Sequence, residues 1–107
     1  MSGLSDAAIY KRKEFGEWLK LVRKVKNISQ GDVAREIGAN TANFISKIER
    51  GESRVPVERI EELARGYRIE EIVFAEAVFR NFMPEIWRWV ERFAKESDLP
   101  ERMSSKS

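Results

Sequence analysis

The stretch Ser29–Gly51, SQGDVAREIGANTANFISKIERG, has the pattern of two short helices separated by a glycine. Ser29 can accept a hydrogen bond at a helix start, and Asp32, three residues later, can reach back to complete a capping box. Gly38 can adopt the left-handed backbone conformation that ends a helix and opens a tight turn. The pattern therefore predicts a first short helix that runs to about Ile37.

The second helix of the pair is expected to begin at Asn40 or Thr41, since either side chain can cap it, and to end at Gly51. Two short helices joined by a glycine turn are typical of a helix-turn-helix, in which the second helix can enter the major groove of DNA. Such pairs also occur in helical proteins of other kinds, so the spacing alone leaves DNA binding open.

Projection of this second helix at about 100° per residue separates an apolar face from a polar face that carries no acid. The apolar face holds Phe44, Ile45 and Ile48, and the polar face holds Asn43, Ser46, Lys47 and Arg50. Side chains of these polar types can contact base edges and phosphates, although a plain solvated face would look the same. Glu49 falls toward the buried side and therefore needs a partner for its charge.

The rest of the chain is also expected to be helical, because it shows no sustained alternation and no hairpin-turn dipeptides. Apolar spacings of three and four residues predict one helix over 11–27 and another after Pro56. A further helix follows Arg68, and Pro84 separates it from a last helix over about 85–95. The helix after Pro56 presents Ile60, Leu63, Ala64 and Tyr67, and the next presents Ile69, Ile72, Val73, Ala77 and Phe79 as inward residues.

The composition limits the class of protein. With 107 residues, 42% of them hydrophobic and 36% charged, the chain suits one folded domain. It has no Cys and no His, so we expect no disulfide, enzyme activity, metal site or cofactor. The adjacent acids Glu61–Glu62 and Glu70–Glu71 do not converge on a helix. Without an apolar run of about 18 residues or a leader segment, a cytoplasmic protein with no membrane partner is expected.

The charge is unevenly distributed along the chain. Residues 1–68 hold 14 Lys and Arg against 10 Asp and Glu, whereas residues 69–107 hold 6 against 8. The net charge of +2 therefore conceals a basic excess in the first two thirds. This distribution indicates where a polyanion would bind.

Several segments resemble, in order and spacing, the lambda-repressor and Cro type of helix-turn-helix domain, also called the xenobiotic-response-element family. They are FGEWLKLVR at 15–23, ISQGDVAREIG at 28–38, NFISKIERG at 43–51 and the helix at Pro56. The resemblance covers about residues 13–75 and implies an all-α, five-helix DNA-binding domain. We divide the chain into a flexible N-terminal arm at 1–10, this domain at 11–82, an extra C-terminal helix at 83–96 and a disordered tail at 97–107.

The resemblance also implies a role for individual positions. Residues expected to face base edges are Thr41, Ala42, Asn43 and Lys47, and those expected near phosphates are Gln30, Ser46, Arg50, Ser53 and Arg54, joined by the basic run Lys11, Arg12 and Lys13. Gln30 should also brace the second helix, and Arg23 should form a buried ion pair with Glu49. The turn after Gly38 is one residue longer than the commonest pattern of the family. Which of Thr41, Ala42 and Asn43 is the first to reach a base therefore stays open.

The last helix carries more apolar surface than one short terminal helix needs to pack on a small core. Its apolar residues are Ile86, Trp87, Trp89, Val90 and Phe93. Trp18 and Leu21 are apolar where the family is usually polar, so they could receive this helix within one chain. The interpretation that we favour is that the last two helices form a homodimer interface, either on their own or together with Trp18 and Leu21.

The combined hypothesis is a homodimeric transcription regulator, a repressor rather than an activator, that reads a pseudo-palindromic operator on double-stranded DNA. No small-molecule effector is expected, because the chain has no second domain of usual effector-binding size. The alternative is an antitoxin-like or other interaction protein that uses its Trp-rich C-terminal helices to hold a different chain.

Overall fold

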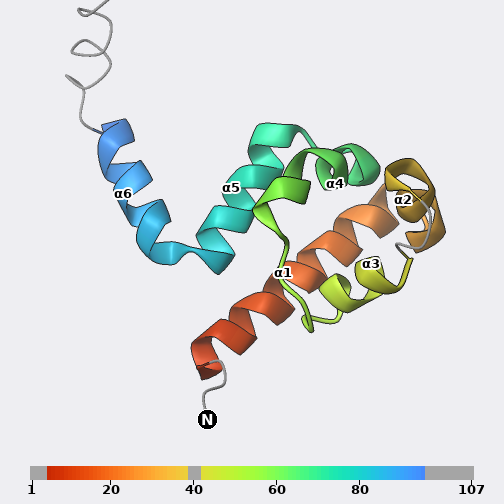
Figure 1. Cartoon of the computed structure of the whole chain (residues 1–107), viewed down its shortest axis with the longest axis horizontal. Helices are drawn as coiled ribbons and strands as arrows, with labels where there is room; N and C mark the ends of the chain where they lie inside the picture. Colours follow the sequence, from red (N-terminus) through yellow and green to blue (C-terminus); the bar gives the residue numbers. More distant parts are fainter. Residues whose placement is uncertain (1–4, 39–41, 96–107) are drawn as a thin grey trace, which may run out of the picture.

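The computed structural model describes residues 5–38 and 42–95, and within these ranges the regular structure is entirely helical. The elements in chain order are α1 (Asp6–Val25), α2 (Gln30–Ile37), α3 (Ala42–Glu49), the 3-10 helix η1 (Val57–Arg59), α4 (Ile60–Tyr67), α5 (Glu71–Phe82) and α6 (Pro84–Lys95). Figure 1 shows the first five α-helices gathered around one core and α6 beyond them. The predicted all-α helix-turn-helix domain with an extra C-terminal helix is confirmed.

α1 begins five residues earlier than the predicted start at Lys11. The side chain of Ser5 caps the helix by accepting a hydrogen bond from the backbone N–H of Ala8 at 3.1 Å. Asp6 adds a negative charge to the first turn, where the helix dipole favours it. The expected flexible arm over 1–10 is therefore wrong for residues 6–10, which are helical; residues 1–4, like the expected tail at 97–107, lie outside the described residues.

The capping box at the start of α2 is present. Ser29 Oγ accepts a hydrogen bond from the backbone N–H of Asp32 at 2.9 Å, and Asp32 Oδ2 accepts one from the backbone N–H of Ser29 at 2.8 Å. The hydrogen bond from the backbone N–H of Ser29 stabilises the charged carboxylate, which lowers the pKa of Asp32. At the other end of α2, Gly38 has a φ of 124°, a conformation that favours glycine.

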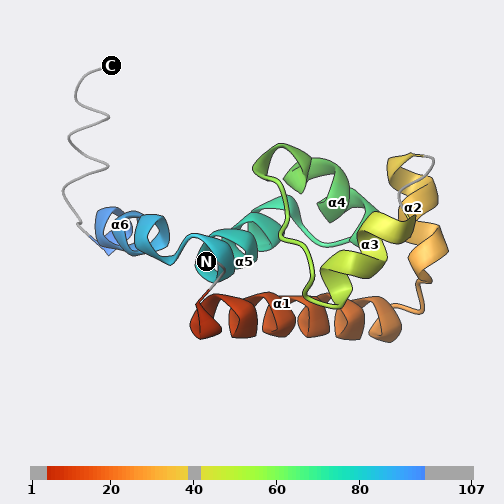
Figure 2. The same cartoon turned by 60° about the horizontal axis from the view of Figure 1, so that its bottom comes forward.

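The core lies where α1 crosses α3 and α5, with α2 and α4 packed against each other beside it. In Figure 2, α1 runs along one side of the molecule while α3 and α5 rest on it. Phe15 meets the rings of Phe74 and Phe82 edge to face, with centroids 6.0 and 5.0 Å apart. Such pairs add about 0.5–1.5 kcal/mol each to the energy of burial, so this cluster holds α5 against α1.

The inward face of α5 differs from the predicted one. Ile72 and Val73 are 70% and 42% exposed, whereas Phe74 and Val78 are completely buried. Ala77 is buried as expected, and Ile69 and Phe79 pack half-buried against the core. The apolar residues of α5 surround most of the helix, so periodicity could not show that the side bearing Phe74 meets Phe15 and Tyr67.

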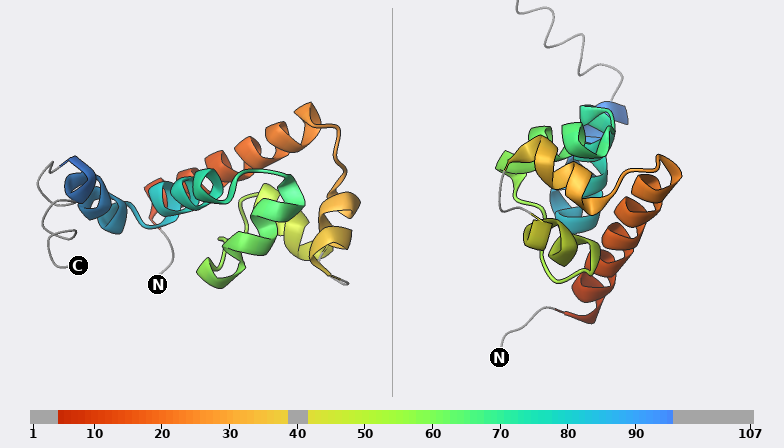
Figure 3. Two further views of the ribbon diagram at one scale, coloured as in Figure 1. Left: turned by 90° about the horizontal axis from the view of Figure 1, so that it is seen from above. Right: turned by 90° about the vertical axis from the view of Figure 1, so that its right-hand side faces the viewer.

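α6 begins directly after Met83, the one non-helical residue between it and α5. Its first residue is Pro84, whose ring suits the first position of a helix but not the interior of a longer one. The left panel of Figure 3 shows α6 standing off the body, at the opposite end of the molecule from α2. The alternative in which Trp18 and Leu21 receive α6 in the same chain is wrong, because Leu21 is exposed and Trp18 packs on Phe15 instead.

Candidate nucleic-acid interface

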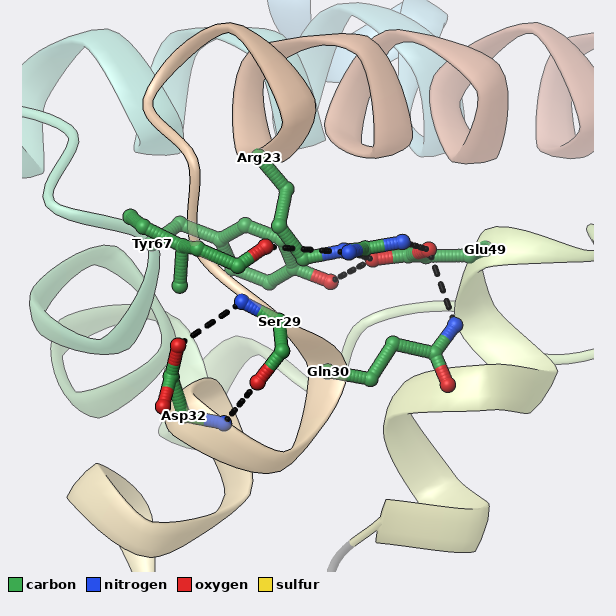
Figure 4. Close-up of polar contacts among 7 residues, drawn as sticks. Arg23, Ser29, Gln30, Asp32, Glu49 and Tyr67 are labelled. Atoms are coloured by element: carbon green, nitrogen blue, oxygen red, sulfur yellow. Dashed lines mark hydrogen bonds and ion pairs between the residues drawn. The ribbon is translucent and has the colours of Figure 1, made fainter.

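One buried carboxylate at the end of α3 joins four helices. Glu49 Oε2 accepts hydrogen bonds from Arg23 Nε at 2.8 Å and from the hydroxyl of Tyr67 at 2.7 Å. Its Oε1 accepts from Arg23 Nη2 at 2.9 Å and from Gln30 Nε2 at 3.0 Å. Figure 4 shows the guanidinium and the carboxylate aligned side by side, with Gln30 and Tyr67 reaching them from α2 and α4. The ion pair between Arg23 and Glu49 and the bracing contact of Gln30 are both present as expected.

The hydroxyl of Tyr67 is the member of this cluster that the sequence interpretation missed. Tyr67 was expected only as an apolar residue of the core, yet its buried hydroxyl donates to Glu49. The available signal was chemical, because a tyrosine on a buried helix face needs a partner for its O–H group. Arg23 adds one more connection by donating from Nη1 to the carbonyl of Ile28 at 3.0 Å. These bonds together set the orientation of α3 against the rest of the domain.

The cluster is charged at neutral pH. Burial alone would raise the pKa of Glu49, but the hydrogen bonds from Arg23, Tyr67 and Gln30 outweigh it and lower that pKa. The bond to Glu49 raises the pKa of Arg23. Burial, followed by the contact with Glu49, raises the pKa of Tyr67, so its hydroxyl stays a neutral donor. Glu49 therefore acts as an ionised acceptor for three separate donors.

The outward face of α3 is accessible. Ile45 and Ile48 are buried as predicted, and Phe44 is half-buried with the guanidinium of Arg59 5.0 Å above its ring. On the opposite side, Asn43 and Lys47 are exposed. Among the described residues neither makes a hydrogen bond or an ion pair through its side chain, so both are available to a ligand. Thr41, and the side chain of Ala42 at the start of α3, lie outside the described part of the chain.

Arg50 is less available than its place on the polar face suggested. Its Nε and Nη2 donate to the two carboxylate oxygens of Glu52 at 2.9 and 3.0 Å, and its Nη1 donates to the hydroxyl of Ser46. The polar face of α3 was predicted to carry no acid, but the carboxylate of Glu52, from the loop that follows α3, lies against it. A helix projection could not show this contact, because Glu52 lies beyond Gly51 and outside the helix.

A second set of cations lies on α1 and on the loop after α3. The turn at Gly51 packs against Lys13, since a Cβ at Gly51 would come within 2.7 Å of Lys13 Cγ. Arg12 and Arg54 line one pocket of about 470 Å³, although 42 positions separate them in sequence. In the described ranges neither arginine pairs with an acid. Of the other phosphate candidates, Lys11 lies 3.9 Å from Glu14, and the hydroxyl of Ser53 donates to the carbonyl of Arg54 at 3.2 Å.

The arrangement defines a class of protein. α2 and α3 form a short helix pair, the inner side of α3 is held by Glu49, and its outer side presents an amide and an ammonium group. Unpaired arginines beside it can contact a phosphate backbone. These are the parts of a helix-turn-helix DNA-binding protein.

Comparison with known families agrees with this class. The model of the family HTH_3, described as Helix-turn-helix, matches residues 19–74, which is just over half of the chain. The chain therefore belongs to the helix-turn-helix family of the xenobiotic-response-element, lambda-repressor-like type, and is a DNA-binding transcription regulator of that type. Comparisons with curated proteins and with solved structures give no match. Within the described residues, none of the helices is both long enough and apolar enough to span a membrane.

Proposed function

We propose that this regulator is a homodimeric repressor that reads a pseudo-palindromic operator with α3 in the major groove. The observation that carries the proposal is the contrast between the two sides of α3. Its inner side is tied by Glu49 to α1, α2 and α4, while Asn43 and Lys47 project outward and make no side-chain hydrogen bond or ion pair among the described residues. Glu52 is near enough to Lys47 for their charges to interact. A helix held in this way presents its outer side chains to DNA in one orientation, as direct readout requires.

Base reading is assigned to the first two turns of α3 and to the residue before it. Asn43 can form a bidentate contact with adenine, and Lys47, one turn later, can donate to the O6 and N7 acceptors of guanine. Thr41 and Ala42 precede them in the sequence and would make the remaining base contacts.

Phosphate contacts are assigned first to the cations without an acidic partner. Arg54, Arg12 and Lys13 supply fixed positive charge beside α3, and Gln30 can offer its remaining amide hydrogen at the start of α2. Arg50 and Ser46 can contribute after a phosphate displaces Glu52, so their contribution to affinity is smaller. Ser53 and Lys11 complete the predicted set at the edge of this surface.

Dimerisation is assigned to α6, whose apolar residues Ile86, Trp89, Val90 and Phe93 are exposed, with Trp87 half-buried beside them. A single α3 contacts few base pairs, whereas a two-fold dimer places two such helices about 34–36 Å apart, one turn of DNA. A dimer that occupies a promoter in this way would repress transcription by blocking access.

Lys47→Ala and Arg54→Ala are expected to weaken DNA binding in different ways. Operator fragments would first be selected from random DNA, and affinity would then be measured by fluorescence anisotropy over a range of salt concentrations. Lys47→Ala should lose about 1–3 kcal/mol on the selected operator and little on random DNA, because it removes a base contact. Arg54→Ala should weaken both DNAs alike and reduce the salt slope by about 1, because it removes a phosphate contact.

Lys95→Ala is the matched control, since Lys95 is exposed at the end of α6, on the side of that helix away from its apolar residues, and should change neither quantity. Equal losses for Lys47→Ala on selected and random DNA would refute the base-reading assignment. Failure to select any sequence would refute the operator proposal.

The interaction-protein alternative also draws on α6, because an exposed aromatic face suits a different chain as well as a second copy. It makes the opposite prediction for the purified protein: a monomer at micromolar concentration that enriches no DNA sequence and co-purifies with one unrelated partner.

A further inference from the structure

An open groove runs between α1 and α5 and has no occupant among the described residues. Its volume is about 450 Å³, and its lining includes the apolar residues Phe15, Trp18, Val73 and Ala77. Charged residues line it as well. α1 contributes Lys11 and Glu14 and α5 contributes Glu76 and Arg80, so each helix supplies one base and one acid.

α6 has a surface that such a groove can receive. Ile86, Trp89, Val90 and Phe93 follow one another at spacings of three, one and three residues, which places them on one side of the helix. Their exposed fractions are 55%, 56%, 39% and 55%. An apolar helix face that enters an apolar groove is a common mode of recognition, with anchors at the i, i+3, i+4 and i+7 positions.

α6 cannot reach the groove of its own chain. The groove extends along α5 as far as Asn81, and only Phe82 and Met83 separate this residue from the start of α6. To enter the groove, α6 would have to reverse direction and lie antiparallel on α5. Antiparallel helices need a connecting loop of about 2–5 residues, but here the connection is Met83 alone. The occupant must come from another molecule.

The area to be covered favours a second copy that exchanges α6 reciprocally. On the scale of about 150–250 Å² for a buried aromatic side chain, the four half-exposed residues of α6 offer on the order of 400 Å². Two α6 helices packed only on each other would cover on the order of 800 Å² in total, which is the size of a crystal contact. Two α6 helices seated in two grooves would cover the same apolar surface and the lining of both grooves as well, which brings the interface closer to the range of about 1,200–2,000 Å² that stable complexes bury.

We infer that α6 of each protomer lies in the α1–α5 groove of its partner, so that the two copies form a dimer with exchanged C-terminal helices. The contact is self-complementary, as a two-fold axis requires, because each chain supplies one helix and one groove. This inference rests on the homodimer of the proposed function and specifies its interface. In this dimer the exposed Val73 and the half-buried Trp18 contact α6 of the partner, whereas in a single chain α6 does not cover them.

Cross-linking between single-cysteine variants tests the arrangement, because the chain contains no cysteine of its own. Val73→Cys would carry a size tag, Val90→Cys would not, and the two would be mixed and treated with a short bifunctional maleimide. The exchange predicts a linked product of mixed size from the pair. Ile72→Cys in place of Val73→Cys is the matched control and should give at least tenfold less product, since Ile72 is exposed on the same helix but does not line the groove.

Three results would overturn the exchange. Linkage of Val90→Cys to itself would show that the α6 helices pair with each other. Linkage within one chain of the double variant Val73→Cys/Val90→Cys would show that α6 reaches its own groove. Absence of any link together with a monomeric mass would assign α6 to a different partner.

A second pair of variants tests the groove through the mass of the protein in solution, measured by light scattering over a range of concentrations. Val73→Arg should raise the dissociation constant of the dimer at least tenfold, and Ile72→Arg should leave it unchanged; circular dichroism would confirm that both fold. Equal effects of the two substitutions on the dissociation constant would contradict the placement of α6 in the groove.

DNA selection separates this inference from the proposed function. Enrichment of a site whose binding depends on Lys47, without cross-linking at Val73, would support the proposed function and overturn the exchange. Cross-linking at Val73 without enrichment of any site would support the exchange and overturn the proposed function.

Discussion

Glu49→Ala is expected to lower the free energy of unfolding by about 3–5 kcal/mol, because it leaves the guanidinium of Arg23 buried without its charge partner. Arg23 is 8% exposed and Glu49 is 5% exposed, so water cannot replace the lost carboxylate. Gln30 and Tyr67 lose their acceptor in the same step. A domain with a total stability of about 5–15 kcal/mol would lose a large part of it. Urea denaturation followed by circular dichroism measures the change.

Two companion variants keep this prediction testable if Glu49→Ala does not fold. Tyr67→Phe removes one donor but leaves the charges paired, and should cost about 1–3 kcal/mol. The double variant Arg23→Met/Glu49→Gln removes both charges together and should be more stable than Glu49→Ala alone. If the double variant were as unstable as the single one, the unpaired charge would not be the cause.

The stability of the wild-type protein should also depend on pH through Glu49. The pKa of this carboxyl group is lowered in the folded state from its ordinary value of 4.5. The stabilisation from its charge is therefore fully present above about pH 4.5 and is lost as the pH falls through the folded-state pKa. Glu49→Gln cannot ionise, so its unfolding free energy should fall less steeply over this acidic range. Parallel curves of stability against pH for the two proteins would contradict the lowered pKa.

Gly16→Ala is expected to lower the free energy of unfolding by about 3 kcal/mol, although in most helix interiors alanine is more stable than glycine. A Cβ at position 16 would lie 2.4 Å from the carbonyl oxygen of Glu49 and 2.6 Å from that of Ile48. Both contacts are with backbone atoms, so no side-chain rotation can relieve them. α1 and α3 would have to move apart, which would strain the hydrogen bonds between Arg23 and Glu49. The urea midpoint measures the loss.

Gly31→Ala is the matched control for this prediction. At this position in α2 an added Cβ would meet only Ser29 Oγ at 3.6 Å and Arg35 Nη1 at 3.9 Å, which are ordinary contacts. The same chemical change should therefore raise stability by up to about 1 kcal/mol. Opposite signs at the two glycines would confirm that the approach of α1 to α3 decides the outcome. A stabilised Gly16→Ala protein would mean that the two helices do not meet at Gly16.

Much of the fold could be predicted from short-range patterns. The capping box of Ser29 and Asp32, the end of α2 at Gly38 and the two faces of α3 depend on atoms within one or two helical turns, so the order of residue types is sufficient to predict them. The pairing of Arg23 with Glu49 joins α1 to α3, which are separated in the sequence by α2. It was expected only because the chain resembles a known family. The same resemblance placed Gln30 against α3.

Other features depended on how the helices cross. The sequence by itself determined that α5 is apolar on most sides, but only its packing on Phe15 and Tyr67 decided that Phe74 is buried and Val73 exposed. Likewise, only the placement of α3 against α1 shows that position 16 has no room for a side chain. Helical periodicity is a local property of the backbone, whereas burial depends on which neighbour arrives from elsewhere in the chain.

The functional surface divides in the same way. The sequence by itself determined that α3 would carry Asn43 and Lys47 on its polar side, because a residue's angle around the helix axis follows from its number. Only the tertiary structure decided that Glu52 pairs with Arg50, that Arg12 and Arg54 share a pocket, and that α6 stands off the body. The physical reason is that charge pairing and exposure depend on distances across loops and between helices, and these are set when the whole chain packs.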